Sequence, residues 1–431
     1  MEIQPAGTTG GWLAAADADS DAWWLKIAAA GTPLVERQPD SERLTLIFFW
    51  RDPAGNEAAS AFQRVYLDIN GVTDHHSFTP QSLQRLPGTA IWSGRVEVEP
   101  DWRGSYSLIP VTAAQLPPPP QGDAEQQRQQ QREWWCSLFP CAIADPLNPH
   151  MPLDGVLSAV HLPQAPDQQA WREVDAGIAS PPAAVSAFEW RSLRLNNRRR
   201  VWLWQPDGGE DMPLIVLLDG QKWVETLSLL PVLEAQTRLG ALPAAAWLMI
   251  DAVDNEVRSR ELTCNADFWL ALQEELLPLA RQRAAFTEDP ARTLVAGQSY
   301  GGLAALYAAL FWPQRFGCVL TQSGSFWWPN MRFMTHFAER ESHEPGFLTQ
   351  QVALRSGAGP LRIFQQAGLR EPDIHFVNQQ MYQALTAAGH QVNYRVYQGG
   401  HDAICWRGGL IDGVRWLLGA DAAEPSLSPL P

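Results

Sequence analysis

The chain has 431 residues, of which 45% are hydrophobic and 18% are charged, so it is long enough for two or three domains that each have a core. Its 32 basic and 47 acidic residues give a formal charge of −15, which argues against a general attraction to nucleic acid or to anionic membranes. No apolar run approaches the roughly 20 residues of a membrane span. We therefore expect a globular protein with neither a nucleic-acid partner nor a membrane partner.

The five cysteines are widely spaced and odd in number: Cys136, Cys141, Cys264, Cys318 and Cys405. The spacing of Cys136 and Cys141 would allow a disulfide but does not indicate one. No C-x-x-C pair or Cys/His cluster suggests zinc, and the first residues lack the charged and apolar regions of a secretory signal. We expect no protein-bound metal or cofactor, and a place in the reducing cytoplasm.

Residues 1–115 are predicted to form a small all-β domain. Short strands with turn sequences between them are expected at residues 44–50, 64–69, 89–98 and 105–110. Strands at this spacing favour an immunoglobulin-like sandwich. Within it, Asp74-His75-His76 could suggest a metal site, but adjacent side chains of an extended chain point to opposite faces. We expect this segment to contact the substrate or the second domain instead.

Residues 116–187 are predicted to be a linker and an irregular connection. The segment opens with four consecutive prolines, Pro117 to Pro120, and continues into a glutamine-rich run that ends at Gln131. Proline stiffens such a chain, and the polar run offers no apolar face to bury. Many further prolines and little periodicity follow, which is typical of chain that lies over a surface.

Residues 188–431 are predicted to form an α/β domain, because strands and helices alternate there. Strands are expected at residues 189–195, 199–205, 213–218, 246–251, 293–296, 318–322, 361–365 and 393–397. Helices are expected at about residues 223–239, 267–282, 373–388 and 403–418, and directly after Gly301. This alternation predicts a mostly parallel sheet with helices on both faces and a ligand site at the carboxyl ends of the strands.

The segment Gly297-Gln298-Ser299-Tyr300-Gly301 fits the G-x-S-x-G pattern. It stands between an apolar strand and a run of small residues suited to a closely packed helix, which is the context of a nucleophile elbow. Glycines on both sides of Ser299 are needed because the sharp turn leaves no room for Cβ atoms. We predict Ser299 as the nucleophile of an α/β hydrolase; the alternative is a glycine-rich turn whose serine caps the helix.

A serine nucleophile needs a base and an acid, which follow it in the chain in this fold. His401 is the predicted base, because Gly399-Gly400-His401-Asp402 follows the last strand and can reach over the nucleophile. The other histidines after Ser299 fall in an insertion or on a helix: His336, His343, His375 and His390. Asp402 is a poor candidate for the acid, because its side chain points away from that of its neighbour.

Two carboxylates follow the strand at residues 361–365, and we predict that Glu371 is the acid because it is nearer to the strand end. The other, Asp373, suits a helix cap, and the choice between them stays open at this point. The oxyanion hole is predicted from the backbone N–H groups of Tyr300, after the nucleophile, and of Gly220-Gln221, after an earlier strand.

The chain resembles the bacterial enterochelin (enterobactin) esterases over nearly its whole length. The resemblance rests on FFWRDPAGN, GVTDHH, PQSLQRLPGT, WRGSYSLIP, AIADPLNPH, VLLDGQKW, IDAVD, RELTCNADFW, VAGQSYGGLAALYA, QSGSFWWP, AGLREPDI and GGHDAICWRGGL. It implies a cytoplasmic α/β hydrolase behind an N-terminal β-sandwich. It also implies a trilactone substrate of three catecholoyl-serine units, usually as the ferric complex, and release of iron by hydrolysis of the ester bonds. Iron then enters only as part of the substrate.

A ferric tris-catecholate carries three negative charges, so we expect local basic and aromatic side chains near the nucleophile. The predicted substrate-binding residues are Arg258, Arg260, Lys222, Arg370, Trp223, Trp327, Trp328 and His75. The alternative for Arg258 and Arg260 is ion pairing with Asp254, Glu256 or Glu261.

Other functions stay open from the sequence. The substrate could be a glucosylated or threonine-based catecholate trilactone, or a feruloyl-type carbohydrate ester. The first domain could also serve as a binding module for a carbohydrate or a protein.

Overall fold

The computed structural model describes residues 3–4, 8–180, 185–335, 337–354 and 359–419. The chain forms two compact units, one of Met1–Asp167 with Gln398–Cys405 and one of Gln168–Tyr397 with Trp406–Pro431. This grouping differs from the boundaries predicted at residues 115 and 187, because the segment between them adds helices and a strand to the units. Among the helices of the described residues, none has the length and apolar character needed to cross a membrane.

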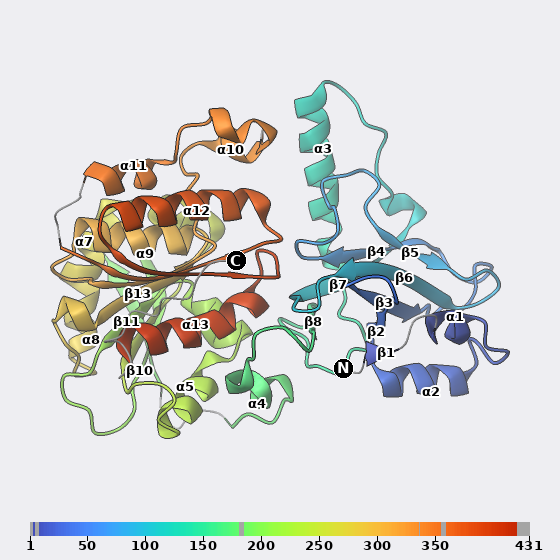
Figure 1. Cartoon of the computed structure of the whole chain (residues 1–431), viewed down its shortest axis with the longest axis horizontal. Coiled ribbons are helices and arrows are strands. Elements are labelled where there is room, and N and C mark those ends of the chain that lie inside the picture. Colours follow the sequence, from blue (N-terminus) through green and yellow to red (C-terminus); the bar gives the residue numbers. More distant parts are fainter. Residues whose placement is uncertain (1–2, 5–7, 181–184, 336, 355–358, 420–431) are drawn as a thin grey trace. The chain divides into compact units, whose positions relative to one another are not determined.

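The first unit is built on an eight-stranded sheet with the order β1-β2-β3-β6-β5-β4-β7-β8 (Figure 1). The strands are β1 (Ile3–Gln4), β2 (Leu34–Arg37), β3 (Leu44–Arg51), β4 (Phe62–Ile69), β5 (Ser82–Arg85), β6 (Ile91–Val98), β7 (Arg103–Thr112) and β8 (Ser158–His161). The helices are α1 (Thr8–Leu13), α2 (Asp21–Ala30) and α3 (Ala124–Ser137). The short strand β5 pairs with β4 on one side and β6 on the other, so it joins the two halves of the sheet.

The core of the first unit draws on both halves of this sheet. Leu46 and Phe48 of β3 belong to the same buried cluster as Leu67 of β4 and Leu108 of β7. Other apolar faces are covered by helices, with α2 packed on β3 and α3 on β7. Most tryptophans of the chain are buried, so their high number reflects aromatic packing.

The glutamine-rich run predicted as a linker is helix α3. Asp123 caps the helix by accepting the N–H groups of Glu125 and Gln126, and the Gln126 side chain bonds back to the backbone of Asp123. Trp134 and Trp135 at the other end are buried against the sheet. Capping and two tryptophans therefore stabilise a helix whose remaining surface is polar.

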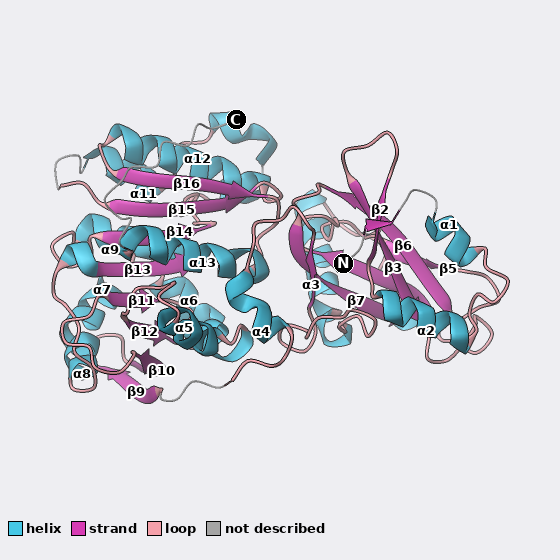
Figure 2. Cartoon of the chain, turned by 60° about the horizontal axis from the view of Figure 1, so that its bottom comes forward, coloured by secondary structure: helices cyan, strands magenta, loops and turns pink. Residues whose placement is uncertain are grey.

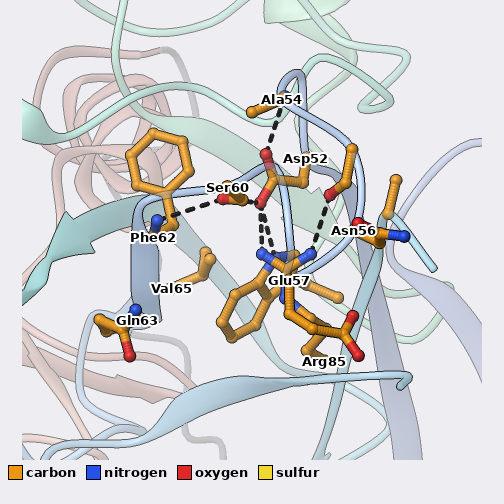
Figure 3. A network of polar contacts seen from close by, with 12 residues as sticks. Asp52, Ala54, Asn56, Glu57, Ser60, Phe62, Gln63, Val65 and Arg85 are labelled. Atoms are coloured by element: carbon orange, nitrogen blue, oxygen red, sulfur yellow. Dashed lines mark hydrogen bonds and ion pairs between the residues drawn. The ribbon is translucent and has the colours of Figure 1, made fainter. Parts of the chain in front are cut away.

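A buried carboxylate holds the loop between β3 and β4 (Figure 3). Asp52 accepts hydrogen bonds from the Ser60 hydroxyl at 2.6 Å and from the Ala54 N–H at 2.9 Å, and pairs with Arg85 at 2.5 Å. The Arg85 guanidinium also lies over the Trp92 ring, 4.5 Å from its centroid. Burial alone would raise the pKa of Asp52, but the hydrogen bonds from Ser60, Ala54, Arg85 and Trp92 lower it below its ordinary value.

We expect Asp52→Asn to lower the free energy of unfolding of the first unit by about 3–5 kcal/mol, because it leaves the buried Arg85 charge without its carboxylate. The fold favours the charged form of Asp52, so its contribution is present above the unfolded pKa of 3.8 and is lost as pH falls through the lower folded pKa. Urea unfolding of the wild type and of Asp52→Asn between pH 7 and pH 3 measures this loss of stability. Equal acid sensitivity of the two proteins would contradict the assignment.

The second unit is an eight-stranded sheet with the order β16-β15-β14-β13-β11-β12-β10-β9 (Figure 2). The strands are β9 (Ser186–Ser192), β10 (Asn197–Trp204), β11 (Leu214–Leu217), β12 (Ala246–Ile250), β13 (Thr293–Gln298), β14 (Cys318–Gln322), β15 (Arg362–Gly368) and β16 (Gln391–Tyr397). Strand β10 is antiparallel to both of its neighbours, β9 and β12, and the other pairs of this sheet are parallel. Strands β11, β13 and β14 are buried at every position, as expected for parallel strands between two helix layers.

Helices cover both faces of this sheet (Figure 1). The described helices of this unit are α4 (Arg172–Asp175), α5 (Leu229–Arg238), α6 (Asn255–Glu261), α7 (Ala266–Ala271), α8 (Leu277–Arg281), α9 (Tyr300–Phe311), α10 (Met331–Thr335), α11 (Phe347–Leu354), α12 (Pro372–Ala387) and α13 (Ala403–Leu418). Two predicted helices are interrupted by π-helical turns, at Lys222–Thr226 and Leu272–Leu276. The α/β fold predicted from the sequence is therefore present, with the carboxyl ends of the parallel strands at one edge.

Candidate active site

The turn between β13 and α9 has the geometry of a nucleophile elbow. Ser299 has a φ of 58° and a ψ of −120°, a conformation that side chains other than glycine rarely adopt. A Cβ on Gly297 would lie 2.3 Å from the carbonyl oxygen of Gly301, so only glycine fits there. Strain of this kind persists only where the surroundings enforce it, which is typical of a functional serine.

Ser299 is held by the neighbouring strand and by the loop that follows it. Its N–H donates to the carbonyl oxygen of Gln322 at 3.0 Å, and its carbonyl oxygen accepts the N–H of Ser325 at 3.1 Å. The hydroxyls of Ser299 and Ser325 lie 3.3 Å apart. These contacts arise because β13 and β14 are adjacent and parallel, so both strands end at the same edge of the sheet.

Glu371, the predicted acid, is buried at the carboxyl end of β15. Its Oε1 accepts hydrogen bonds from the hydroxyl of Ser323 and from the N–H of Gly368, the latter at 2.7 Å. The hydroxyl of Tyr397, at the end of β16, lies 3.3 Å from the same oxygen. Trp406 donates its indole N–H to the hydroxyls of both Ser323 and Tyr397 at 3.0 Å. These contacts fix the position of Oε1.

The alternative acid, Asp373, lies in the first turn of α12. Its Oδ1 accepts the N–H of Ile374 at 2.9 Å, at the helix end where backbone N–H groups lack partners within the helix. The helix cap expected at Asp373 is not found, because the N-cap position of α12 belongs to Glu371 and Asp373 is the second residue of the helix. Glu371, which lies in the buried network, stays the predicted acid.

The loop after β11 comes close to its neighbours at the predicted oxyanion donors. A Cβ on Gly220 would lie 2.6 Å from the backbone nitrogen of Ile250, so the close approach to β12 requires glycine. Gln221 accepts the N–H of Ala252 through its side-chain oxygen at 3.1 Å. Tyr300 is the first residue of α9, where the helix itself gives its N–H no partner. Both predicted donors therefore belong to firmly held backbone.

Arg258 of α6 holds the loop after β11 in place. Its guanidinium makes two parallel bonds to Asp219, at 2.6 and 2.7 Å, and it also donates to the carbonyl oxygen of Gln298 at 3.3 Å. Its charge lies over the Tyr300 ring, 5.7 Å from the centroid. Asp219 has a φ of 55°, directly before Gly220. The Arg258–Asp219 pair thus stabilises a strained turn beside both predicted oxyanion donors.

His401 lies in the loop between β16 and α13, within the segment Gln398–Cys405 that groups with the first unit. Its carbonyl oxygen accepts a hydrogen bond from the Asn70 side chain at 3.0 Å. Asp402 is buried and accepts both the N–H and the hydroxyl of Ser105 on β7, at 2.6 and 2.8 Å. Burial raises the pKa of Asp402, while the bonds from Ser105 oppose that rise. Side chains of the first unit therefore hold the loop that carries the predicted base.

Comparison with known proteins decides the family. The family model described as "Enterochelin esterase, N-terminal" matches residues 45–171, and the model named Esterase matches residues 192–417. The iron(III) enterobactin esterase of Dickeya dadantii is 59% identical over 426 residues, which cover 97% of each chain. The chain belongs to the enterochelin esterase family. The resemblance seen in the sequence is therefore confirmed.

Two crystal structures of the family have the same fold. The ferric enterobactin esterase of Salmonella typhimurium is 42% identical, with a TM-score of 0.80 over 92% of this chain and 98% of the other. The enterobactin esterase of Shigella flexneri, solved in the presence of enterobactin, is 41% identical, with a TM-score of 0.78 over 93% and 98%. The likeness confirms an α/β ester hydrolase with an N-terminal sheet domain; the finer immunoglobulin-like description stays a prediction.

Three predicted substrate contacts of this esterase require correction. Arg258 is paired with Asp219, a partner that the sequence alternatives did not include. Trp223 is 2% exposed and donates its indole N–H to Gln298 Oε1 at 3.1 Å, so its ring packs inside the unit and does not face a ligand. Trp327 is also buried, tilted against the Tyr300 ring. Both tryptophans stabilise the elbow from within.

The remaining predicted contacts are more accessible. Arg260 has a side chain that is 55% exposed and a loose contact of 3.9 Å with Glu256. Lys222 is exposed on the π-helical turn, and Arg370 and Trp328 are half-buried. His75, in the first unit, is 42% exposed, stacks on Trp135 and lies 3.9 Å from Asp68.

The other histidines give weaker candidates for the base. His390 accepts the N–H of Leu361 through Nδ1, at the amino end of β15 and so away from the elbow edge. His343 packs edge-on against Phe333, and His375 lies on α12 with its pKa lowered by burial. His336 lies outside the described residues.

A row of buried amides under the elbow was not predicted. Gln298 donates to Gln322 at 3.0 Å, and Gln322 donates to Gln366 at 2.7 Å, so the row crosses the ends of β13, β14 and β15. At one end of the row, Trp223 donates its indole N–H to Gln298 Oε1. Gln322 also donates to the carbonyl oxygen of Trp406 on α13. The sequence signal is that each of these buried strands has a glutamine at or near its carboxyl end.

We expect Arg258→Lys to lower kcat about 10- to 100-fold with little change in KM, because lysine cannot replace the two parallel bonds that hold the turn beside the predicted oxyanion donors. Arg260→Gln is the matched comparison on the same helix and should raise KM with kcat unchanged. Steady-state kinetics on a ferric trilactone separate the two effects. A raised KM with normal kcat for Arg258→Lys would assign Arg258 to substrate binding instead.

Proposed function

We propose that this esterase hydrolyses the trilactone ester bonds of ferric enterobactin and so releases its iron. The observation that carries the proposal is the strained Ser299 elbow, in a chain that matches iron(III) enterobactin esterase over 97% of its length. The catalytic roles assigned to Ser299, His401 and Glu371 form part of the proposal. They rest on chain order, on the elbow and on the buried Glu371 network.

The proposed reaction follows the serine-hydrolase scheme. His401 takes the Ser299 proton as Oγ attacks a lactone carbonyl carbon, and Glu371 orients the imidazole and stabilises its charged form. The N–H groups of Tyr300 and Gln221 bind the oxyanion. The C–O bond of the ester then breaks, His401 protonates the departing alkoxide, and the ring opens as an acyl-enzyme. Water, deprotonated by His401, releases the linear product and restores Ser299.

Positive charge for the anionic substrate is assigned to Lys222, Arg260 and Arg370. Each follows the carboxyl end of a strand, β11, β12 or β15. Ligands of α/β sheets bind at that edge, and three cations there supply local positive charge within an acidic chain. Trp328 is the proposed stacking partner for a catechol ring, and His75 stays a proposed contact.

We make one proposal on the fold of the first unit and one on its role. We propose that its sheet folds into the immunoglobulin-like sandwich predicted from the sequence, because one buried cluster draws on both of its halves. We also infer that it supports catalysis, because Asn70 and Ser105 hold the loop of His401.

Reaction in the cytoplasm is proposed as well, and five free cysteines suit a reducing compartment. Iron is part of the substrate, and the scheme assigns no metal or other cofactor to the chain.

A comparison of substrates tests the proposal. The kcat/KM values for ferric enterobactin, glucosylated enterobactin, a threonine-based trilactone and a feruloyl ester are measured under one condition. We expect ferric enterobactin to give the highest value. A higher value for the glucosylated or threonine-based lactone would move the assignment to that siderophore, and one for the feruloyl ester would overturn it.

A further inference from the structure

We propose that Ser325 is a second catalytic residue, whose hydroxyl donates a hydrogen bond to Oγ of the nucleophile as negative charge develops there. The proposal rests on the proposed function for the identity of Ser299 as nucleophile. It deepens that function by adding a side-chain donor at the reacting oxygen, beside the base and the backbone oxyanion donors.

The environment of the Ser325 hydroxyl points to this role. Ser325 is 2% exposed, and buried hydroxyls require hydrogen-bond partners. Within the described part of the chain, its hydroxyl has one such partner, the Ser299 Oγ at 3.3 Å. The free-energy cost of burying this hydroxyl is therefore offset by its hydrogen bond to the nucleophile. A role for the hydroxyl in catalysis explains why it is buried at this position.

The loop around Ser325 is held by contacts that do not involve its side chain. Its N–H donates to the carbonyl oxygen of Ser299, and its carbonyl oxygen accepts the N–H of Trp328 at 3.1 Å. The residue before it, Gly324, accepts a bond from the Asn378 side chain at 2.9 Å. The hydroxyl is therefore positioned by fixed backbone, as a preorganised catalytic donor must be.

The distance suits a bond that strengthens during reaction. A length of 3.3 Å exceeds the usual 2.5–3.0 Å for hydroxyl pairs, so the contact is weak in the resting state. When the Ser299 proton moves to the base, Oγ gains negative charge, and a bond donated to it becomes shorter and about twice as strong. Ser325 keeps its own proton throughout. The same bond assists deacylation, when Ser299 Oγ is the leaving group.

The test compares three variants: Ser325→Ala, Ser325→Thr and Ser192→Ala. Ser325→Ala removes the donor but keeps every backbone contact, and Ser325→Thr restores a hydroxyl. Ser192→Ala is the matched control, because Ser192 is another buried serine of the second unit, on the far edge strand β9, whose hydroxyl accepts the Leu195 N–H. Thermal unfolding checks that all three variants fold.

Two rates are measured for each folded variant. One is the labelling of Ser299 by a small fluorophosphonate, in which the Oγ–P bond forms, fluoride leaves and the proton goes to the base. The other is kcat for ferric enterobactin, with its KM. We expect Ser325→Ala to lower both rates about 10- to 100-fold at unchanged KM, the effect of one hydrogen bond to a charged group. Ser325→Thr should recover most of the loss, and Ser192→Ala should match the wild type.

Labelling of Ser325→Ala at the wild-type rate would overturn the proposal, and so would an equal loss in Ser192→Ala. Because labelling needs no siderophore, it tests Ser325 even if the substrate assignment fails. A wild-type protein that labels at Ser299 but leaves ferric enterobactin intact would contradict the proposed function alone.

Discussion

Replacement of Ser299 by alanine should lower kcat for ferric enterobactin by about 10⁴-fold or more, as expected when the nucleophile of a serine hydrolase is removed. The alanine variant should still bind the ferric complex, because the proposed binding charges lie on Lys222, Arg260 and Arg370. Quenching of tryptophan fluorescence measures binding, and product chromatography measures turnover. Undiminished turnover would exclude Ser299 as the nucleophile.

A matched variant guards this result against a folding defect. Ser192→Ala removes a similarly buried serine hydroxyl from the same unit, and its turnover should equal that of the wild type. Alanine has a Cβ as serine does, so Ser299→Ala leaves the backbone strain at this position unchanged. Thermal unfolding should therefore show a folded protein.

The second large effect is expected at Glu371, the proposed acid. Glu371→Gln should lower kcat about 10³- to 10⁴-fold, because an amide cannot stabilise the charged imidazole that forms in the transition state. The variant keeps an oxygen that can accept the bonds from Ser323 and Gly368, so the buried network and the fold should persist. Steady-state kinetics with a check of thermal unfolding provide the measurement.

Asp373→Asn is the matched control for the acid, two residues along the chain. Its carboxylate accepts the N–H of Ile374 in the first turn of α12, and the amide should cost little activity. A large loss in Asp373→Asn with a small loss in Glu371→Gln would reverse the assignment that the buried network supports.

The second unit was largely predictable because its signals are local. The strand predicted at residues 318–322 is β14 without change, and the elbow follows β13 as the G-x-S-x-G pattern requires. The π-helical turn at Lys222–Thr226 was predicted as ordinary helix. Local patterns of burial and glycine spacing report strands and tight turns well.

Contacts between distant segments could not be predicted. Asp219 meets Arg258 because their loops follow the adjacent strands β11 and β12, and Ser325 meets Ser299 because β13 and β14 end together. Helix α3 was missed because its stabilising contacts, Trp134 and Trp135 packed on the sheet, depend on strands elsewhere in the chain. Pairings of this kind follow from sheet order, which one sequence does not specify.

The central claim is that the chain opens a trilactone through a serine ester, and a product time course on ferric enterobactin tests it most directly. Samples of the wild type and of Ser299→Ala are quenched at intervals and separated by chromatography with mass detection. The linear, ring-opened trimer should appear first with the wild type and be absent with Ser299→Ala. Intact lactone throughout the wild-type course, or the same product course from both proteins, would contradict the account.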